Sequence, residues 1–174
     1  MRSAAGFTLV ELLVTLVLVG ILVGLGVPAM RGLIAPAAMQ SWVTSYHMAL
    51  RTTRHMAVSA NRGVTLCALD DNGRCTGQWD RRLALFFDPG RTGQLQDAAD
   101  LITHTKITDG ENIRVTWRGF GERRFLHVRA NGSYRQNGRF TFCGQTAAPG
   151  GQGRQIVVNV TGRTRVEPAA CDGG

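Results

Sequence analysis

The chain has 174 residues, a formal net charge of +8, 22 glycines and four cysteines. Once a hydrophobic N-terminal segment is set aside, roughly 110–140 residues remain, about the size of one globular domain. Frequent Gly, Asn, Asp and Thr residues after Asn61 predict many turns between short strands, and so an all-β or α+β domain. His104 and His127 lie in predicted strands without a neighbouring nucleophile, so we expect neither an enzyme nor a cofactor.

The excess positive charge belongs to the C-terminal half. Residues 1–110 carry ten basic and eight acidic side chains, whereas residues 111–174 carry ten basic and four acidic ones. Lys106 is the only lysine, and arginine suits phosphate better because its planar head presents paired donors. A compositional bias towards arginine would give the same count, so charge by itself indicates a kind of partner and not a fold.

Residues 7–28 form the hydrophobic segment. Between Leu12 and Val27 nothing is more polar than Thr15, and with residues 7–10 the stretch is just long enough to cross a bilayer as a helix. A secretory signal peptide would need a small-residue cleavage site after the apolar core, and Pro28-Ala29-Met30 is a poor one. We therefore predict a single transmembrane helix over residues 7–28.

Glu11 interrupts this segment near its start. A carboxylate in hydrocarbon costs about 2.5–3.5 kcal/mol, so it requires a cation. Cleavage after Gly6 would create an α-amino group on Phe7, and in a neighbouring subunit that group would lie at the depth of Glu11. Pairing of the two charges would favour a staggered assembly of subunits, so we interpret Glu11 as an assembly residue.

The run Gly6-Phe7-Thr8-Leu9-Val10-Glu11 resembles the class III signal of type IV pilins and type II secretion pseudopilins. The resemblance implies that a prepilin peptidase removes residues 1–6 after Gly6, that Phe7 becomes N-methylated, and that Glu11 guides packing into a filament. It also implies a single-pass bacterial inner-membrane protein with its head in the periplasm, or outside the cell once assembled. The expected partners are other pilin subunits, the peptidase and membrane lipid.

Residues 29–61 predict an amphipathic periplasmic helix, with Pro28 and Pro36 expected to kink or loosen it locally. Gln40, Thr44, His47, Arg51 and Arg54 fall on one face, which we expect to be solvated, as we expect of the side chains of His47 and His55. The opposite face has packing residues at three- and four-residue steps: Met39, Trp42, Val43, Tyr46, Ala49, Leu50, Thr53, Met56, Ala57 and Ala60. Asn61-Arg62-Gly63 predicts the end of the helix.

The head, residues 62–174, is expected to hold antiparallel strands packed on that helix, in an α+β, pilin-like fold. Asn131-Gly132 is the strongest hairpin signal. Further turns are predicted at Asp71-Asn72-Gly73, Asp88-Pro89-Gly90 and Asp109-Gly110. Runs rich in β-branched or aromatic residues predict strands at residues 64–69, 83–87, 102–107, 113–117, 125–129, 139–143 and 156–160.

All four cysteines follow the hydrophobic segment, and an even count in an exported domain indicates two disulfides. Cys67 and Cys75 flank one predicted turn, which leaves Cys143 for Cys171, although four cysteines allow three connectivities. A zinc site is the rival interpretation. No pair has the short spacing of a zinc knuckle, so we expect no metal.

The body of the chain resembles the GspH/FimT branch of minor pilins and pseudopilins. The resemblance is carried by residues 51–61, Val64-Thr65-Leu66-Cys67, Trp79, residues 85–88, Gly132 and residues 156–165. FimT-type subunits are associated with DNA uptake and carry a Gly-Arg-x-Arg motif, present here as Gly162-Arg163-Thr164-Arg165. The secretion pseudopilin H is associated with the tip of a pseudopilus.

The motif has a physical rationale of its own. On an extended strand Arg163 and Arg165 would share a face about 6–7 Å apart, close to the spacing of successive phosphates. Arg154 is expected in a flexible glycine-rich loop nearby, and Arg114, Arg118, Arg123, Arg124, Arg135 and Arg139 are possible extensions chosen by charge. Charge on an edge strand also prevents aggregation, which is the plainer explanation.

These observations predict a minor type IV pilin whose head binds double-stranded DNA without sequence preference during natural transformation. The alternative is a type II secretion pseudopilin H that acts in protein export.

Overall fold

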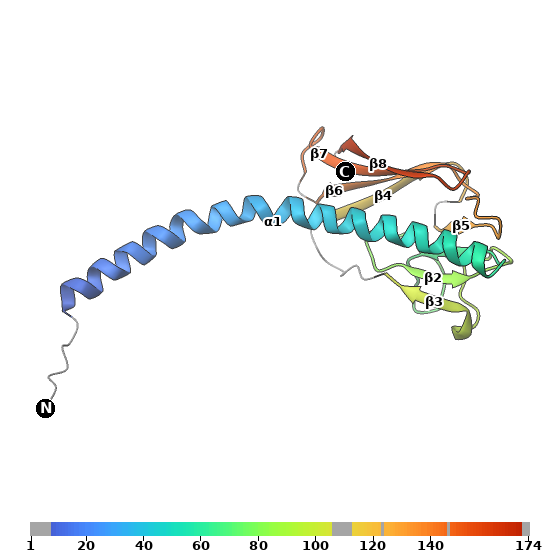
Figure 1. Cartoon of the computed structure of the whole chain (residues 1–174), viewed down its shortest axis with the longest axis horizontal. Coiled ribbons are helices and arrows are strands. Elements are labelled where there is room, and N and C mark those ends of the chain that lie inside the picture. The colour runs from blue at the N-terminus through green and yellow to red at the C-terminus, as the bar shows by residue number, and fades with distance from the viewer. Residues whose placement is uncertain (1–7, 106–112, 123, 146, 172–174) are drawn as a thin grey trace, which may run out of the picture. The chain divides into compact units, whose positions relative to one another are not determined.

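The chain begins with one long helix, α1 (Leu9–Ser59), and the strands of the head follow it (Figure 1). The computed structural model describes residues 8–105, 113–122, 124–145 and 147–171, and only the backbone of residues 23–36. The chain divides into two compact units, residues 1–38 and residues 39–174. The head belongs to the second unit. Among the described residues, no helix has the length and apolar character that a membrane crossing requires.

The first turn of α1 is capped by its own sequence. The Glu11 backbone N–H donates to Thr8 Oγ1 at 3.3 Å, as an N-cap threonine allows. Glu11 also lies in the first helical turn, where a negative charge is favoured by the helix dipole. The backbone remains helical at Pro28 and Pro36, so neither proline ends the helix.

The helix ends where the sequence predicts. Asn61 has a φ of 51°, the left-handed conformation that closes many helices. The Arg62 N–H then donates to the Ala57 carbonyl at 3.1 Å, which completes a Schellman-type cap. The chain therefore leaves the helix directly into the first strand.

The predicted packing face of residues 37–60 is confirmed. Its buried members are Trp42, Val43, Tyr46, Ala49, Leu50, Thr53 and Ala57, while Ala60 is exposed. Tyr46 is at the centre of this face: its ring meets Phe140 and Phe142 edge-on at centroid distances of 5.3 and 5.0 Å, and its hydroxyl donates to the Trp79 carbonyl. Aromatic packing thus joins helix and sheet.

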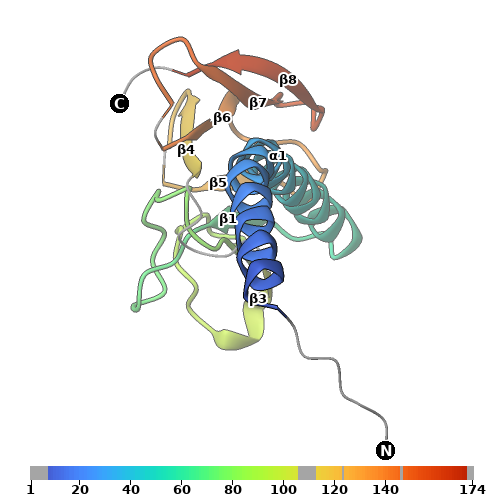
Figure 2. The ribbon, with the colours of Figure 1, turned by 90° about the vertical axis from the view of Figure 1, so that its left-hand side faces the viewer.

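The antiparallel strands of the head divide into two four-stranded sheets, with residues 39–59 of α1 between them (Figures 1 and 2). The first sheet has the order β3-β2-β1-β5, and the second β4-β6-β7-β8. The strands of the first are β1 (Val64–Cys67), β2 (Ala84–Phe87), β3 (Leu101–His104) and β5 (Leu126–Val128), with a short 3-10 helix η1 (Ala98–Asp100) before β3. Those of the second are β4 (Ile113–Gly119), β6 (Gly138–Gly144), β7 (Gln152–Val158) and β8 (Thr164–Ala170).

The C-terminal strands differ most from their predicted ranges. The strand expected at residues 156–160 is β7, which ends at Val158 because Asn159 begins a turn. β8 contains Pro168 and is an edge strand, where a missing backbone N–H is tolerated. Residues 106 and 107 of the strand predicted at 102–107, and the Asp109-Gly110 turn, lie outside the described residues.

Two disulfides join Cys67 to Cys75 and Cys143 to Cys171, so the expected pairing is confirmed. The first closes a small loop after β1. The second fixes the residue after β8 to β6, two strands away in the sheet, and so holds the C-terminal hairpin in place.

Candidate functional site

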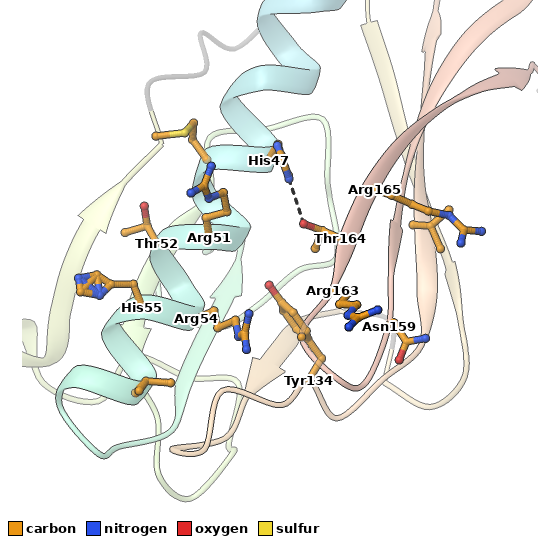
Figure 3. Close-up of a pocket in the computed structure, with 14 residues that line it drawn as sticks. His47, Arg51, Thr52, Arg54, His55, Tyr134, Asn159, Arg163, Thr164 and Arg165 are labelled. Carbon is orange, nitrogen blue, oxygen red and sulfur yellow. Dashed lines mark hydrogen bonds between the residues drawn. The ribbon is translucent and has the colours of Figure 1, made fainter.

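A groove of about 1250 Å³ runs between the last turns of α1 and the β7–β8 hairpin (Figure 3). Four arginines line it, Arg51, Arg54, Arg163 and Arg165, together with His47 and His55. No carboxylate is among the described residues that line it. The groove therefore concentrates positive charge where an anion has access.

Helical spacing supplies one wall of the groove. His47, Arg51, Arg54 and His55 recur at steps of three and four residues, so they lie along one side of α1. At a rise of about 1.5 Å per residue, the wall from His47 to Val58 is roughly 16 Å long. At about 6–7 Å between successive phosphates, that length accommodates about two to three phosphates of one strand.

Hydrogen bonds hold the helix against the opposite wall. His47 Nε2 lies 3.0 Å from Thr164 Oγ1, and Arg54 Nε donates to the Gly132 carbonyl at 3.1 Å. The Tyr134 hydroxyl donates to the Leu50 carbonyl at 3.0 Å. Burial raises the pKa of Tyr134 well above its usual value, so this donor stays protonated.

A tight turn supplies the other wall. The Asn159 N–H donates to the Arg163 carbonyl at 3.0 Å, and the Gly162 N–H donates to the Asn159 carbonyl at 2.9 Å. Gly162 has a φ of 87° and is buried against Arg54 and Gly132. A glycine is needed here because a side chain would meet both strain and these neighbours.

The fold presents Arg163 and Arg165 differently. Arg163 lies in the turn before β8, next to Tyr134, and so it is not part of the strand that the sequence predicts for it (Figure 3). Arg165 lies in β8 and points away from α1, with its Nε 2.5 Å from Glu167 Oε1 and its side chain 71% exposed (Figure 3). The motif thus brings one arginine into the groove and one to its outer edge.

Arg154 lies in β7 and not in the predicted flexible loop. It occupies the same side of the strand as the core residues Ile156 and Val158. Its Nε is buried and has no hydrogen-bond partner among the described residues. Arg154 does not line the groove.

Arg118 and Arg139 are neighbours on the outer face of the second sheet. Arg118 pairs with Arg139 between β4 and β6, Arg139 pairs with Val157, and Val157 pairs with Arg165. Residues in register share a face, so this row continues from the outer edge of the groove across the sheet.

The other arginines proposed as extensions lie elsewhere. Arg124 and Arg135 line a second pocket. Arg114 is in β4, and Arg123 lies outside the described residues, as do Gly6 and Phe7. No group of three or more His, Cys, Asp or Glu residues that could hold a metal occurs in the described ranges.

The helical wall was missed as part of a site. The sequence predicts a solvated face for His47, Arg51 and Arg54; Arg51 and Arg54 are exposed, and the same face lines the groove. A signal existed: basic residues at helical spacing shortly before a helix end, in a chain with a second basic motif. Only the fold brings the two together, since they are more than a hundred residues apart in sequence.

A long N-terminal helix packed by its second half on antiparallel sheets defines the pilin fold, and with an N-terminal methylation signal it defines a pilin-like subunit. The prokaryotic N-terminal methylation motif matches residues 1–27. The family of type II transport protein GspH matches residues 43–162, and the chain belongs to this family. No curated protein sequence matches the chain significantly.

Solved structures agree on the fold. The type IV minor pilin FimU of Pseudomonas aeruginosa has a TM-score of 0.61 at 20% identity, covering 79% of this chain and 95% of that one. A second crystal form of FimU gives a TM-score of 0.53 at 22% identity, with coverages of 76% and 97%. The minor pseudopilin EpsH of the Vibrio cholerae type 2 secretion system gives 0.52 at 14%, with coverages of 74% and 95%.

Family membership sets the general role. The chain is a non-enzymatic structural subunit, a minor pilin or pseudopilin. Its methylation motif implies a pilin anchored in the inner membrane, with other pilins and a prepilin peptidase as partners.

Proposed function

We propose that this chain is a minor pilin of a type IV pilus whose head binds double-stranded DNA, without sequence preference, for uptake in natural transformation. The observation that supports this function is the groove lined by four arginines and two histidines and by no carboxylate among its described residues. Phosphate contacts of this kind position DNA without reading its bases.

In this proposal the phosphates of one strand follow the groove between α1 and the β7–β8 hairpin. Arg51, Arg54 and Arg163 bind them inside the groove, and Arg165 binds at its outer edge. Arginine heads offer paired donors to phosphate oxygens, which makes these contacts strong and salt-dependent. The row of Arg139 and Arg118 extends the same charge along the sheet.

The test uses the full chain in non-ionic detergent micelles and a fluorescent duplex at rising salt. Arg163→Gln/Arg165→Gln should bind duplex about tenfold or more weakly at low salt. The slope of log K against log salt should become shallower by about 1.8, since each lost phosphate contact removes about 0.9.

The matched control is Arg74→Gln/Arg81→Gln, which removes the same charge from exposed positions outside the groove. It should keep most of the affinity. Equal losses in the two double variants would show a net-charge effect and contradict a site in the groove. No binding of duplex at low salt by the unmodified chain would reject the proposed function altogether.

The alternative is a type II secretion pseudopilin, which the likeness to EpsH makes worth testing. A subunit that only packs against other pseudopilins has no need for an open groove lined by four arginines, of which only Arg165 forms an ion pair among the described residues. The groove therefore favours the DNA-binding function.

We also propose that the leader is cut after Gly6, that Phe7 begins the mature chain, and that residues 7–28 span the inner membrane. Glu11 then pairs with the amino terminus of a neighbouring subunit. Charge neutralisation in hydrocarbon supports this, because an unpaired carboxylate there is costly.

A further inference from the structure

A second pocket, of about 510 Å³, lies on the head, and it is joined to the groove in sequence because Arg135 of the pocket follows Tyr134 of the groove. Three segments form it: the loop after β2, residues 120–122 and 124–125 between β4 and β5, and the turn that follows β5. Arginines line it, chiefly Arg91, Arg129 and Arg135, which we call the arginine triplet. Phe120, Glu122, Arg124 and Gln136 are also in its lining.

The hairpin at Asn131-Gly132 places two of these arginines together. Val128 and Tyr134 face each other across it and are buried. Arg129 and Arg135 are their neighbours in sequence, so both project from the opposite face of the hairpin. Both side chains are exposed.

The carboxylate of Asp88 organises the loop that carries Arg91, the third arginine of the triplet. This carboxylate accepts hydrogen bonds from the backbone N–H groups of Thr92 and Gly93 at 2.8 and 2.9 Å, and from Thr65 Oγ1 at 2.9 Å. The loop closes with Arg91 N–H donating to the Asp88 carbonyl at 3.1 Å. Arg91 has a φ of 54°, an uncommon conformation for a side-chain-bearing residue. The loop thus holds Arg91 in a defined position.

The positive charge of the triplet is not balanced by the described residues around it. No carboxylate there forms an ion pair with any of its members. Glu122 is bonded through both oxygens to Arg124, at 3.2 Å each, and Asp88 is occupied within its own loop. Desolvation lowers the pKa of Arg135, and the charges of Arg91 and Arg129 lower it further, as expected for cations held close together.

His127 lies beneath the triplet and adds no charge to it. Its ring is buried, with Nδ1 3.0 Å from Thr65 Oγ1. Burial is the main reason that its pKa falls to about 4; Asp88 opposes this fall, and the triplet adds to it. The imidazole is therefore neutral at neutral pH, and the charge of the pocket comes from its arginines and from Glu122, which is bonded to Arg124.

Phe120 gives the pocket an aromatic surface. Its side chain is 88% exposed, more than any other large hydrophobic residue in the described part of the head. An exposed aromatic ring offers a face on which a planar base can stack, and the pocket's arginines lie on the same surface. The pocket volume falls in the range of about 300–1,000 Å³ that is typical of sites for small ligands.

We infer that this pocket binds an unpaired nucleotide of single-stranded nucleic acid, with the arginine triplet on its phosphates and Phe120 stacked on its base. A paired base has both faces covered by its neighbours in the duplex, so the stacking contact requires an unpaired end, gap or single strand. An acidic peptide would satisfy the arginines but would leave the aromatic ring without a stacking partner.

The pocket and the groove are joined through one turn. Gly132, between Arg129 and Arg135, accepts a hydrogen bond from Arg54 of the groove at 3.1 Å, and the Tyr134 N–H donates to the Val160 carbonyl of the β7–β8 turn at 3.0 Å. A nucleic acid that lies in the groove therefore has a second binding site within reach. The inference rests on the proposed function only in that both ligands are nucleic acid.

The experiment compares a short fluorescent oligo(dT) with a duplex of the same length, bound to the full chain in detergent micelles. Phe120→Ala and Phe120→Leu should each weaken oligo(dT) binding by about tenfold, in line with stacking on one base, and leave duplex binding unchanged. Leu keeps apolar bulk and loses the ring, so it separates stacking from simple hydrophobic contact. Arg129→Gln/Arg135→Gln should also weaken oligo(dT) binding, unlike Arg74→Gln/Arg81→Gln.

Unchanged oligo(dT) affinity in the Phe120 variants would overturn the inference. A second result would also overturn the inference. If the same concentration of poly-Glu displaces the oligonucleotide from Phe120→Leu and from the unmodified chain, the pocket recognises charge alone. The two proposals fail separately. Loss of duplex binding in Arg163→Gln/Arg165→Gln tests the groove, and the Phe120 variants test the pocket.

Discussion

Gly162 shows how one residue controls the groove. It combines a φ of 87° with close neighbours: a Cβ there would lie 2.7 Å from Arg54 Nε and 2.8 Å from the Gly132 carbonyl oxygen. Arg54 belongs to the helical wall of the groove and Gly132 to the hairpin that leads to the second pocket. The absence of a side chain therefore lets three segments meet.

Gly162→Ala should destabilise the head by roughly 1–3 kcal/mol, the cost of holding a non-glycine residue in this strained conformation. It should also weaken duplex binding because Arg54 must move. Urea unfolding and the duplex assay measure these effects. Gly150→Ala is the matched control: it has a φ of 78°, but its added Cβ has no neighbour within 4 Å. If both variants lose the same stability and neither loses affinity, the packing at Gly162 does not shape the groove.

At the scale of the element, the start of α1 gives Glu11 two possible roles. Its backbone N–H is capped by Thr8, and the Thr-x-x-Glu spacing is that of a capping box, in which the acid supports the helix end. The second role is the proposed pairing with the amino terminus of another subunit. Glutamine at this position can serve a helix start but carries no charge, so it separates the two roles.

We expect Glu11→Gln and Glu11→Ala to insert into the membrane normally and to be incorporated into filaments equally poorly, because both remove the charge. Quantitative immunoblotting of sheared filaments against the membrane fraction measures incorporation. Normal incorporation of Glu11→Gln together with a defect in Glu11→Ala would assign the residue to helix capping and contradict the pairing.

On the scale of the whole molecule, the distribution of charge along the chain and the order of the elements together determine where the basic residues gather. The basic C-terminal half forms the second sheet and the hairpin, and α1 supplies further cations from the first third of the chain. The disulfide between Cys143 and Cys171 fixes the end of β8 to the sheet. A chain-entropy estimate gives about 3–4 kcal/mol for a loop of this length, so the hairpin that carries Arg163 is well anchored.

A deletion strain complemented with Arg163→Gln/Arg165→Gln should show a strongly reduced transformation frequency, normal levels of the protein in filaments, and unchanged protein secretion. Arg74→Gln/Arg81→Gln should restore transformation. Transformants are counted and secreted proteins are assayed in parallel for the strains that carry the two double variants. Lost secretion with normal transformation would instead favour the pseudopilin function.

Local sequence determined those features that depend on near neighbours. The packing face of α1, its end at Asn61, the Asn131-Gly132 hairpin, the disulfide pairs and most strand positions follow from side-chain periodicity and turn chemistry, which act over a few residues. The N-terminal motif and the family were likewise readable from Gly6 to Glu11 and from residues 156–165.

The tertiary structure alone decided the division into two sheets and the composition of both candidate sites. Arg51 and Arg54 meet Arg163 because α1 packs beside the β7–β8 hairpin, and no local pattern encodes that contact. Arg154 lies in a strand and not in the predicted loop, because pairing with β6 and β8 extends β7 back to Gln152. Long-range pairing and packing place these charges, and they depend on the whole core and not on the residues nearest in sequence.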